Sequence, residues 1–216
     1  LIEMIPTATK TDFKVVYQFN HPTLDAKNII TYLVKADGSL NVQTKLVPAD
    51  PMKLKYLPRY GLRMAIDQKF QQVTYYGKGP FENYVDRNTA AQVGSYQTNV
   101  DDFYVPYIRP QENGYRTEVR NVSFIDETNV GVRIIADELI SFSAHRNPLE
   151  DFDPGNNKKQ THSIDIRPKD KIWLHIDSRQ VGVGGDDSWS KKGLANDEYR
   201  IKEKDYEFGF TIKPAN

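Results

Sequence analysis

Apolar and polar residues alternate with a period of two along much of this chain. The clearest run is 13–19, where Phe13, Val15, Tyr17 and Phe19 alternate with Lys14, Val16 and Gln18. Successive side chains of an extended strand point to opposite faces, so such a run turns one set toward a core and the other toward water. The same alternation recurs at 40–47, 172–177 and 206–212. In the run 172–177, this pattern places His175 and Asp177 on the wetter face, and we expect His175 at the surface.

Further strands are expected between these runs, at 29–34, 60–67, 71–77, 114–124, 130–136 and 139–144. An Asp-Gly pair at 37–38 predicts a hairpin, because glycine tolerates the positive φ of a tight turn. Only 86–93 looks helical, and it is short. Roughly ten strands with little helical periodicity indicate one all-β sandwich domain spanning 1–216.

Composition narrows the functional classes. The 216 residues carry 29 basic and 29 acidic side chains, and this balance argues against binding to nucleic acid. With no cysteine, disulfides, Cys-ligated metals and thiol nucleophiles are excluded. No apolar stretch approaches the roughly 18 residues of a membrane-spanning helix, and no signal peptide is visible. The compartment, cytoplasmic or periplasmic, is left open.

Two long polar loops are expected, at 147–160 and 182–197, and the second holds Gly-Gly-Asp-Asp-Ser-Trp at 184–189. An indole offers a flat face against which a sugar can pack, while neighbouring carboxylates and hydroxyls can hydrogen-bond it. The alternative is that Trp189 folds back to anchor its loop and the aspartates cap local N–H groups. Spacing alone favours this second interpretation.

Other candidate chemistry is weaker. The adjacent aspartates 101–102 and 186–187 point to opposite sides of an extended chain, so we expect solvated or capping side chains rather than catalysis. The four histidines form no metal-binding helical pair, and no nucleophilic serine motif is present. In the segment 75–87, Glu82, Asn83, Asp86 and Arg87 could bind sugar, but a network that holds the loop is favoured.

Three motifs together resemble one family. The segment 77–87, Gly-Lys-Gly-Pro-Phe-Glu-Asn-Tyr-Val-Asp-Arg, is similar to a signature of the C-terminal domain of bacterial β-galactosidases of glycoside hydrolase family 2. The segment 106–114, which includes Glu112 and Asn113, and the segment 182–190 resemble two further motifs of that family. The three occur in the family's order, and the resemblance runs from about residue 10 to the end.

The resemblance implies a galactose-mutarotase-like β-supersandwich of mostly antiparallel strands at the end of a large enzyme. Such enzymes hydrolyse terminal non-reducing β-D-galactose residues, as in lactose, with retention of configuration. Their catalytic glutamates lie in a barrel absent from these 216 residues, so no catalytic residue, metal or cofactor is assigned here. The parent's Mg and Na sites are expected mainly in that barrel, and the parent is a possible homo-oligomer.

Within this chain, the resemblance implies that Trp189 contacts the β-galactoside, with Asp187 and Ser188 as further candidates. It assigns Glu82, Asn83, Asp86, Arg87, Glu112 and Asn113 to a structural role. The family's small domain usually begins earlier, so we expect an incomplete first sheet with an exposed edge strand. The alternatives are a free-standing carbohydrate-binding module and a mutarotase-like protein, although no matching catalytic His and Glu motif is found.

Overall fold

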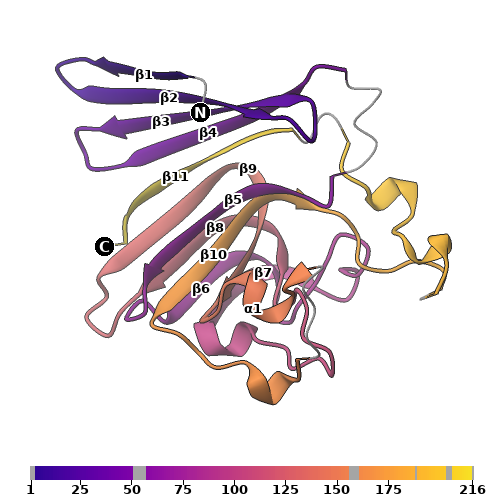
Figure 1. Ribbon diagram of the computed structural model, residues 1–216. Helices are drawn as coiled ribbons and strands as arrows, with labels where there is room; N and C mark the ends of the chain where they lie inside the picture. The colour runs from indigo at the N-terminus through magenta and orange to yellow at the C-terminus, as the bar shows by residue number, and fades with distance from the viewer. Residues whose placement is uncertain (1–2, 51–56, 156–160, 188, 203–205, 216) are drawn as a thin grey trace.

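The computed structural model describes residues 3–50, 57–155, 161–187, 189–202 and 206–215. Eleven strands dominate the described residues (Figure 1): β1 Glu3–Ala8, β2 Asp12–His21, β3 Ala26–Lys35, β4 Leu40–Pro48, β5 Arg59–Asp67, β6 Gln72–Gly79, β7 Gln92–Asn99, β8 Arg116–Ile125, β9 Gly131–His145, β10 Lys171–Gln180 and β11 Glu207–Ala215. The helical segments there are short: η1 Val100–Phe103, α1 Leu149–Phe152, η3 Ser163–Asp165, η4 Lys191–Gly193 and η5 Asp197–Tyr199.

The strands join in one 11-stranded antiparallel arrangement. Its main path runs β1-β2-β3-β4-β11-β9-β8-β6-β7, while β10 branches from β9 and carries β5 on its other side. Antiparallel pairing alone allows consecutive strands to be joined by short turns, as at β2–β3–β4. The prediction of an all-β, mostly antiparallel fold is confirmed.

One long strand, β9, holds the branch point. The sequence suggested two strands, 130–136 and 139–144, but the structure has a single strand, Gly131–His145. Its first half pairs with β11, from Gly131↔Ala215 to Ala136↔Phe210, and its second half pairs with β10. The polar residues Asp137 and Glu138 mark the place where the partner changes rather than a break in the strand.

The helix predicted at 86–93 is wrong. Tyr84 and Arg87 instead close a tight turn through reciprocal backbone hydrogen bonds of 3.3 and 2.8 Å. From Gln92 onward the chain forms β7, the edge strand that pairs with β6 from Gly79↔Gln92 to Gln72↔Asn99. A short segment has little intrinsic helical stability, and the ladder with β6 satisfies its backbone groups instead.

The core lies between the curved sheet and the β5–β10 branch. Phe142 of β9 sits at its centre, with the rings of Phe103, Tyr75 and Phe124 centred 5.4, 5.5 and 6.2 Å away. Toward the other end, the Tyr60 ring of β5 packs edge-on against Phe208. Large buried side chains from several strands thus fix the branch against the sheet.

Two expectations about the first strands are confirmed. Gly38, at φ +79°, forms the turn of the β3–β4 hairpin. Within the described part of the chain, β1 pairs only with β2, and all six of its residues are exposed, so β1 is an edge strand. In Figure 1, β1 to β4 form the upper layer of the molecule, with β1 outermost.

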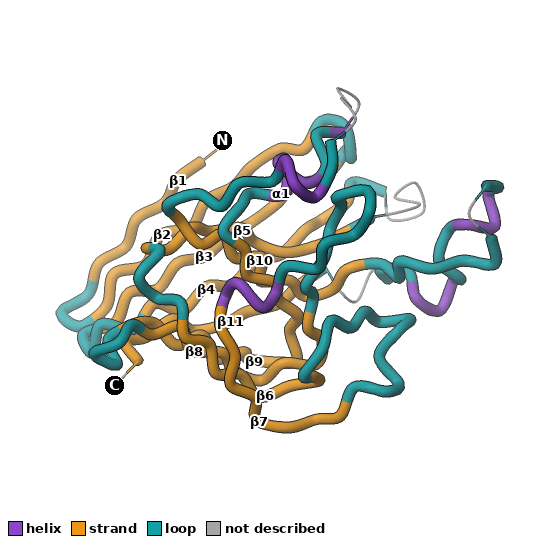
Figure 2. Tube along the Cα trace, turned by 90° about the horizontal axis from the view of Figure 1, so that it is seen from below, coloured by secondary structure: helices purple, strands orange, loops and turns teal. Residues whose placement is uncertain are grey.

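The loops position the candidate site. Figure 2 shows the segment after β10, with its short helices η4 and η5, projecting from the body on the side away from the C-terminus. This segment holds the Gly-Gly-Asp-Asp-Ser-Trp motif. Among the described residues, no helix has the length and apolar character needed to cross a membrane.

Candidate functional site

Glu82 joins the first two sequence motifs. One carboxylate oxygen, Oε1, accepts hydrogen bonds from Arg87 Nη2 at 2.5 Å and from the Tyr107 hydroxyl. The other, Oε2, accepts from the backbone N–H of Gly114 at 2.5 Å and from the Tyr84 hydroxyl at 3.4 Å. A carboxylate with this many donors is committed to holding the two loops together.

Asn83 is fully buried and uses all of its side-chain hydrogen-bonding capacity. Its Nδ2 donates to the carbonyls of Lys78 and Phe81 at 3.1 and 3.0 Å. Its Oδ1 accepts from the backbone N–H and the hydroxyl of Thr117 at 3.1 and 2.6 Å. The amide therefore fastens the turn after β6 to the start of β8.

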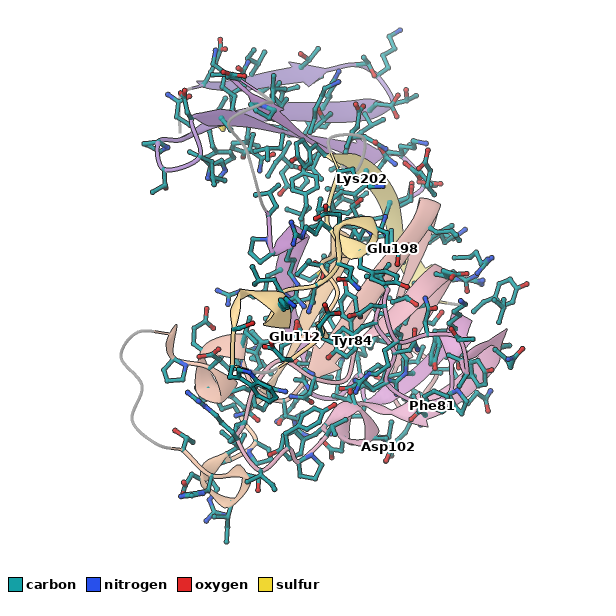
Figure 3. The ribbon with its side chains drawn as sticks, turned by 90° about the vertical axis from the view of Figure 1, so that its right-hand side faces the viewer. Phe81, Tyr84, Asp102, Glu112, Glu198 and Lys202 are labelled. Carbon is teal, nitrogen blue, oxygen red and sulfur yellow. The ribbon has the colours of Figure 1, made fainter. Side chains whose placement is uncertain are left out.

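Arg59 contacts the buried carboxylate of Asp177 and the half-buried carboxylate of Glu112. Its Nη2 lies 2.6 Å from Glu112 Oε2, and its Nε lies 2.9 Å from Asp177 Oδ2. The Tyr115 hydroxyl donates to the same Asp177 oxygen at 2.8 Å. Gly61 makes room for this group, because a Cβ there would meet Asp177 Oδ1 at 1.9 Å. Figure 3 labels Glu112 beside Tyr84, whose hydroxyl donates to it at 3.5 Å.

Burial has the largest effect on the pKa values of the two acids in this cluster. It raises the pKa of Glu112 to about 7 and that of Asp177 to about 6, although the Arg59 charge opposes both shifts. The adjacent cavity measures only about 10 Å³, room for about one water molecule. Two acids with raised pKa values are thus present, but this cavity is too small for a sugar.

His175, expected at the surface, is half-buried. Its Nδ1 accepts a hydrogen bond of 2.9 Å from Arg59 Nη1, and burial together with the nearby guanidinium lowers its pKa to about 3. Asp177, expected on the same wetter face, is completely buried. Because the loop that carries Glu112 covers this side of β10, its polar residues meet Arg59 rather than water.

His145, which the sequence left without a role, is also buried. Its Nε2–H donates to the Asn113 carbonyl at 2.8 Å, and its ring packs edge-on against Phe152. Burial lowers the pKa of His145 to about 4, so the ring is neutral near pH 7.

Trp189 is exposed, with 85% of its surface open to solvent. Its loop is held instead by Asp187, whose Oδ1 accepts from the backbone N–H groups of Trp189 and Ser190 at 3.1 and 2.8 Å. Asp187 Oδ2 accepts from the Ser190 hydroxyl at 2.6 Å, and these bonds lower the pKa of Asp187. Ser188 lies outside the described residues.

Asp86 connects the first motif to the third. Its Oδ2 accepts a hydrogen bond of 2.8 Å from the backbone N–H of Gly184. The two segments are close enough that a Cβ at Gly182 would lie 2.6 Å from this oxygen, so a side chain there would displace the Asp86 carboxylate. Asp86 thereby ties the start of the Trp189 loop to the turn after β6.

An open hollow of about 900 Å³ lies beside the first motif, with Phe81, Glu82, Arg87 and Asp102 among its walls. Both acids are already engaged: Glu82 as above, and Asp102 by the Asn99 N–H and the Thr98 hydroxyl, both at 3.0 Å. Of the pair 101–102, Asp102 caps the short helix η1 and Asp101 is exposed, as expected of solvated or capping aspartates. Among the described residues, no group of three or more His, Asp or Glu side chains is arranged to hold a metal ion.

Sequence reasoning missed Arg59, Tyr115 and Asp177. Arg59 precedes its partners by 53 residues for Glu112 and by 116 for His175, and no local motif links them. The available signal was the alternation itself: an Asp and a His on the polar side of a strand rich in buried isoleucine and leucine.

The three sequence motifs thus meet in one all-β domain, and comparison with known families identifies the family. The family model described as "Beta galactosidase small chain" matches residues 3–212. The chain belongs to this family.

Curated relatives carry the name beta-galactosidase. One from Streptococcus thermophilus is 32% identical over 206 residues, 94% of this chain and 19% of the relative. One from Staphylococcus xylosus is 34% identical over 184 residues, 85% of this chain and 17% of the relative. The chain therefore spans about a fifth of the length of the curated relatives that it matches.

Among solved structures, a putative aldose 1-epimerase from Escherichia coli K12 aligns with a TM-score of 0.44 and 8% identity. The alignment covers 98% of this chain and 68% of that one.

Replacing Asn83 with alanine should lower the free energy of unfolding by about 2–4 kcal/mol. The substitution leaves buried carbonyl and hydroxyl groups of three residues without partners, and each such group costs about 1–3 kcal/mol before relaxation. Urea unfolding followed by tyrosine fluorescence measures the change. The control Asn20→Ala, at an exposed position of β2, should stay within about 0.5 kcal/mol of the original. If Asn83→Ala and Asn20→Ala lowered the free energy of unfolding equally, the structural role of Asn83 would be contradicted.

Glu112→Gln should change the pH dependence of stability. Burial raises the pKa of Glu112 from 4.5 to about 7, so the folded chain keeps a proton that the unfolded chain loses. This contribution to stability is fully present below about pH 4.5 and is lost as the pH rises through about 7. Glutamine has no such proton.

The measured quantity is the difference in the free energy of unfolding between the original chain and Glu112→Gln. This difference should fall by up to about 3 kcal/mol between pH 4.5 and 8, because each unit of pKa shift corresponds to about 1.4 kcal/mol. Urea titrations at several pH values provide the measurement, with Glu127→Gln in an exposed turn as the control. A difference that stays constant, or that grows with pH, would rule out the raised pKa.

Proposed function

We propose that this chain is the C-terminal domain of a longer retaining β-galactosidase. The enzyme hydrolyses terminal non-reducing β-D-galactose residues in β-galactosides such as lactose. The main support for this proposal is the match of residues 3–212 to the small-chain family. The relatives named beta-galactosidase are also about five times longer than this chain. On this proposal the catalytic barrel, with its acid/base and nucleophile, belongs to the remainder of the polypeptide.

In this proposal Trp189 forms part of the substrate platform. Support comes from its 85% exposure and from a loop that keeps its shape without the indole. An exposed indole presents its flat face to the C–H groups of a hexose. Asp187 contributes by shaping the loop, since both of its oxygens already accept bonds from loop residues.

The second contribution is a rigid support for that loop. Hydrogen bonds run from Glu82 and Asn83 into the body of the fold, and Asp86 reaches out to Gly184. Sites that must be positioned accurately gain from such a supporting layer. Glu82, Asn83, Asp86, Arg87, Glu112 and Asn113 therefore serve as structural residues.

Metal ions and assembly belong to the longer enzyme in this proposal. Mg and Na are bound mainly by its barrel, and the enzyme forms a homo-oligomer. The relatives are bacterial, and either the cytoplasm or the periplasm is compatible with the chain. The alternatives, an independent carbohydrate-binding module or a mutarotase, are not favoured by relatives of this name and length.

The isolated 216-residue chain should not hydrolyse lactose or nitrophenyl galactoside. A retaining mechanism needs two carboxyl groups about 5 Å apart on either side of the scissile bond. Glu82 and Asp102, the acids of the 900 Å³ hollow, are both occupied by donors of the fold. Release of nitrophenol is the measurement. Turnover that disappears on substitution of one carboxylate in this chain would overturn the proposal.

In the longer enzyme, Trp189→Ala should weaken transition-state binding by about 1–3 kcal/mol, measured as kcat/KM for lactose. This is the scale of losing an aromatic contact and its buried apolar area. Trp189→Phe should recover part of the loss, because a ring is retained. Leu194→Ala, 53% exposed in the same projecting segment, is the matched control and should leave kcat/KM unchanged. Unchanged kinetics for Trp189→Ala would remove its role.

A further inference from the structure

Arg116 is a buried cation that lines the open hollow of about 900 Å³ beside the first motif. Only 4% of the residue is exposed. Its Nε donates to the Tyr75 hydroxyl at 3.2 Å, and its Nη1 donates to the carbonyls of Gly114 and Tyr115 at 3.1 and 3.2 Å. It forms no ion pair with a described residue, so neutral groups alone hold this charge, whereas buried charges are ordinarily paired.

One nitrogen of this guanidinium is unused by the fold. Every guanidinium nitrogen is a hydrogen-bond donor, but Nη2 of Arg116 donates to no described residue. Some side-chain atoms of the chain are fully buried and lack a partner, as in Tyr104, and Nη2 is not one of them. Nη2 therefore keeps contact with the open space that Arg116 lines, where it can donate to a ligand.

Asp102 offers the complementary acceptor in the same hollow. Its bonds from the Thr98 hydroxyl and the Asn99 N–H both fall on Oδ2, and Oδ1 has no partner among the described residues. Thr89 is an exposed residue of the walls whose hydroxyl makes no hydrogen bond within the described chain, and a hydroxyl can both donate and accept. The hollow thus presents a donor, an acceptor and a hydroxyl that the fold itself does not use.

Phe81 supplies an aromatic surface beside these polar groups. The residue is 49% exposed, and Pro80 and Val105 add further apolar surface to the walls. Figure 3 shows Phe81 and Asp102 in the same part of the molecule, apart from Glu198 in the segment that projects after β10. An aromatic face with polar groups around it suits a sugar ring, whose C–H groups pack on the aromatic face while its hydroxyls form hydrogen bonds.

The described walls carry no net charge. Their cations are Arg87 and Arg116, their acids are Glu82 and Asp102, and Arg87 already pairs with Glu82. The hollow therefore does not select an anion, and its unused donor and acceptor together favour a neutral ligand with several hydroxyls. Its volume of about 900 Å³ lies within the roughly 300–1,000 Å³ of small-molecule sites.

We propose that this hollow is a saccharide-binding site in addition to the platform of Trp189, which is not among its described walls. A galactoside unit packs its C–H face on Phe81, accepts hydrogen bonds from Arg116 Nη2 and donates a hydroxyl to Asp102 Oδ1. The site binds the sugar and cleaves no bond. The choice of a galactoside rests on the proposed function, whereas the choice of a neutral saccharide rests on the aromatic and polar walls.

Equilibrium dialysis of the longer polypeptide against radiolabelled methyl β-D-thiogalactoside tests the proposal, because a thioglycoside resists hydrolysis while it binds. Ala90→Trp fills the hollow from an exposed position of its walls, and Ala36→Trp, in the exposed turn between β3 and β4, is the matched control. The original protein and Ala36→Trp should each bind one more galactoside per chain than Ala90→Trp. Phe81→Ala should weaken this additional binding at least fivefold, because the aromatic surface is lost.

Equal numbers of bound galactosides in the original protein and in Ala90→Trp would overturn the proposal. Displacement of the additional galactoside by inorganic phosphate would also overturn it, since the hollow would then be an anion site. Nitrophenyl galactoside hydrolysis is measured on the same protein samples. Hydrolysis without the additional site refutes this site alone, whereas the additional site without hydrolysis refutes the proposed function alone.

Discussion

The contact of Arg59 with the buried Asp177 and the half-buried Glu112 is the constraint on which the motif region depends. One guanidinium faces Glu112 and Asp177, so one negative charge is left without a partner when both acids are ionised. Burial then raises the pKa of each acid, and near neutrality the cluster favours holding a proton. Breaking this group would leave a buried charge exposed to an apolar interior. The loop that carries Glu112 is consequently fixed against β5 and β10.

From that fixed loop, a continuous series of contacts reaches the Trp189 segment. The loop presents Tyr107 and the Gly114 N–H to Glu82, and Glu82 also binds Arg87. The turn between Glu82 and Arg87 contains Asp86, which binds Gly184 at the start of the Trp189 loop. Three motifs that are far apart in the sequence thus form one hydrogen-bonded body. The three motifs occur together because each supplies hydrogen-bonding groups that another motif contacts.

Local alternation predicted most strands because each has one apolar face, as at 13–19 and 206–212. It failed where long-range contacts decide the structure. The segment 92–99 becomes β7 only because β6 offers it an edge, and β9 stays continuous across Asp137 because it changes partner there. His175 is half-buried and hydrogen-bonded to Arg59, a residue 116 positions away, and no local pattern reveals this contact. The network around Glu82 was anticipated in kind, but its partners Tyr107 and Gly114 were not.

The loop of Trp189 shows why exposure of the indole is informative. In long loops an aromatic ring often folds inward and anchors the segment, and spacing alone favoured that interpretation here. The structure assigns the anchoring to other groups: Asp187 accepts three local hydrogen bonds, Gly185 lies too close to Gly193 for any side chain, and Asp86 holds the entry. The ring is not needed for the loop's shape. A large apolar surface kept in water by a loop that does not require it is typical of a binding contact, and this is the physical basis for our proposal that Trp189 contacts the substrate.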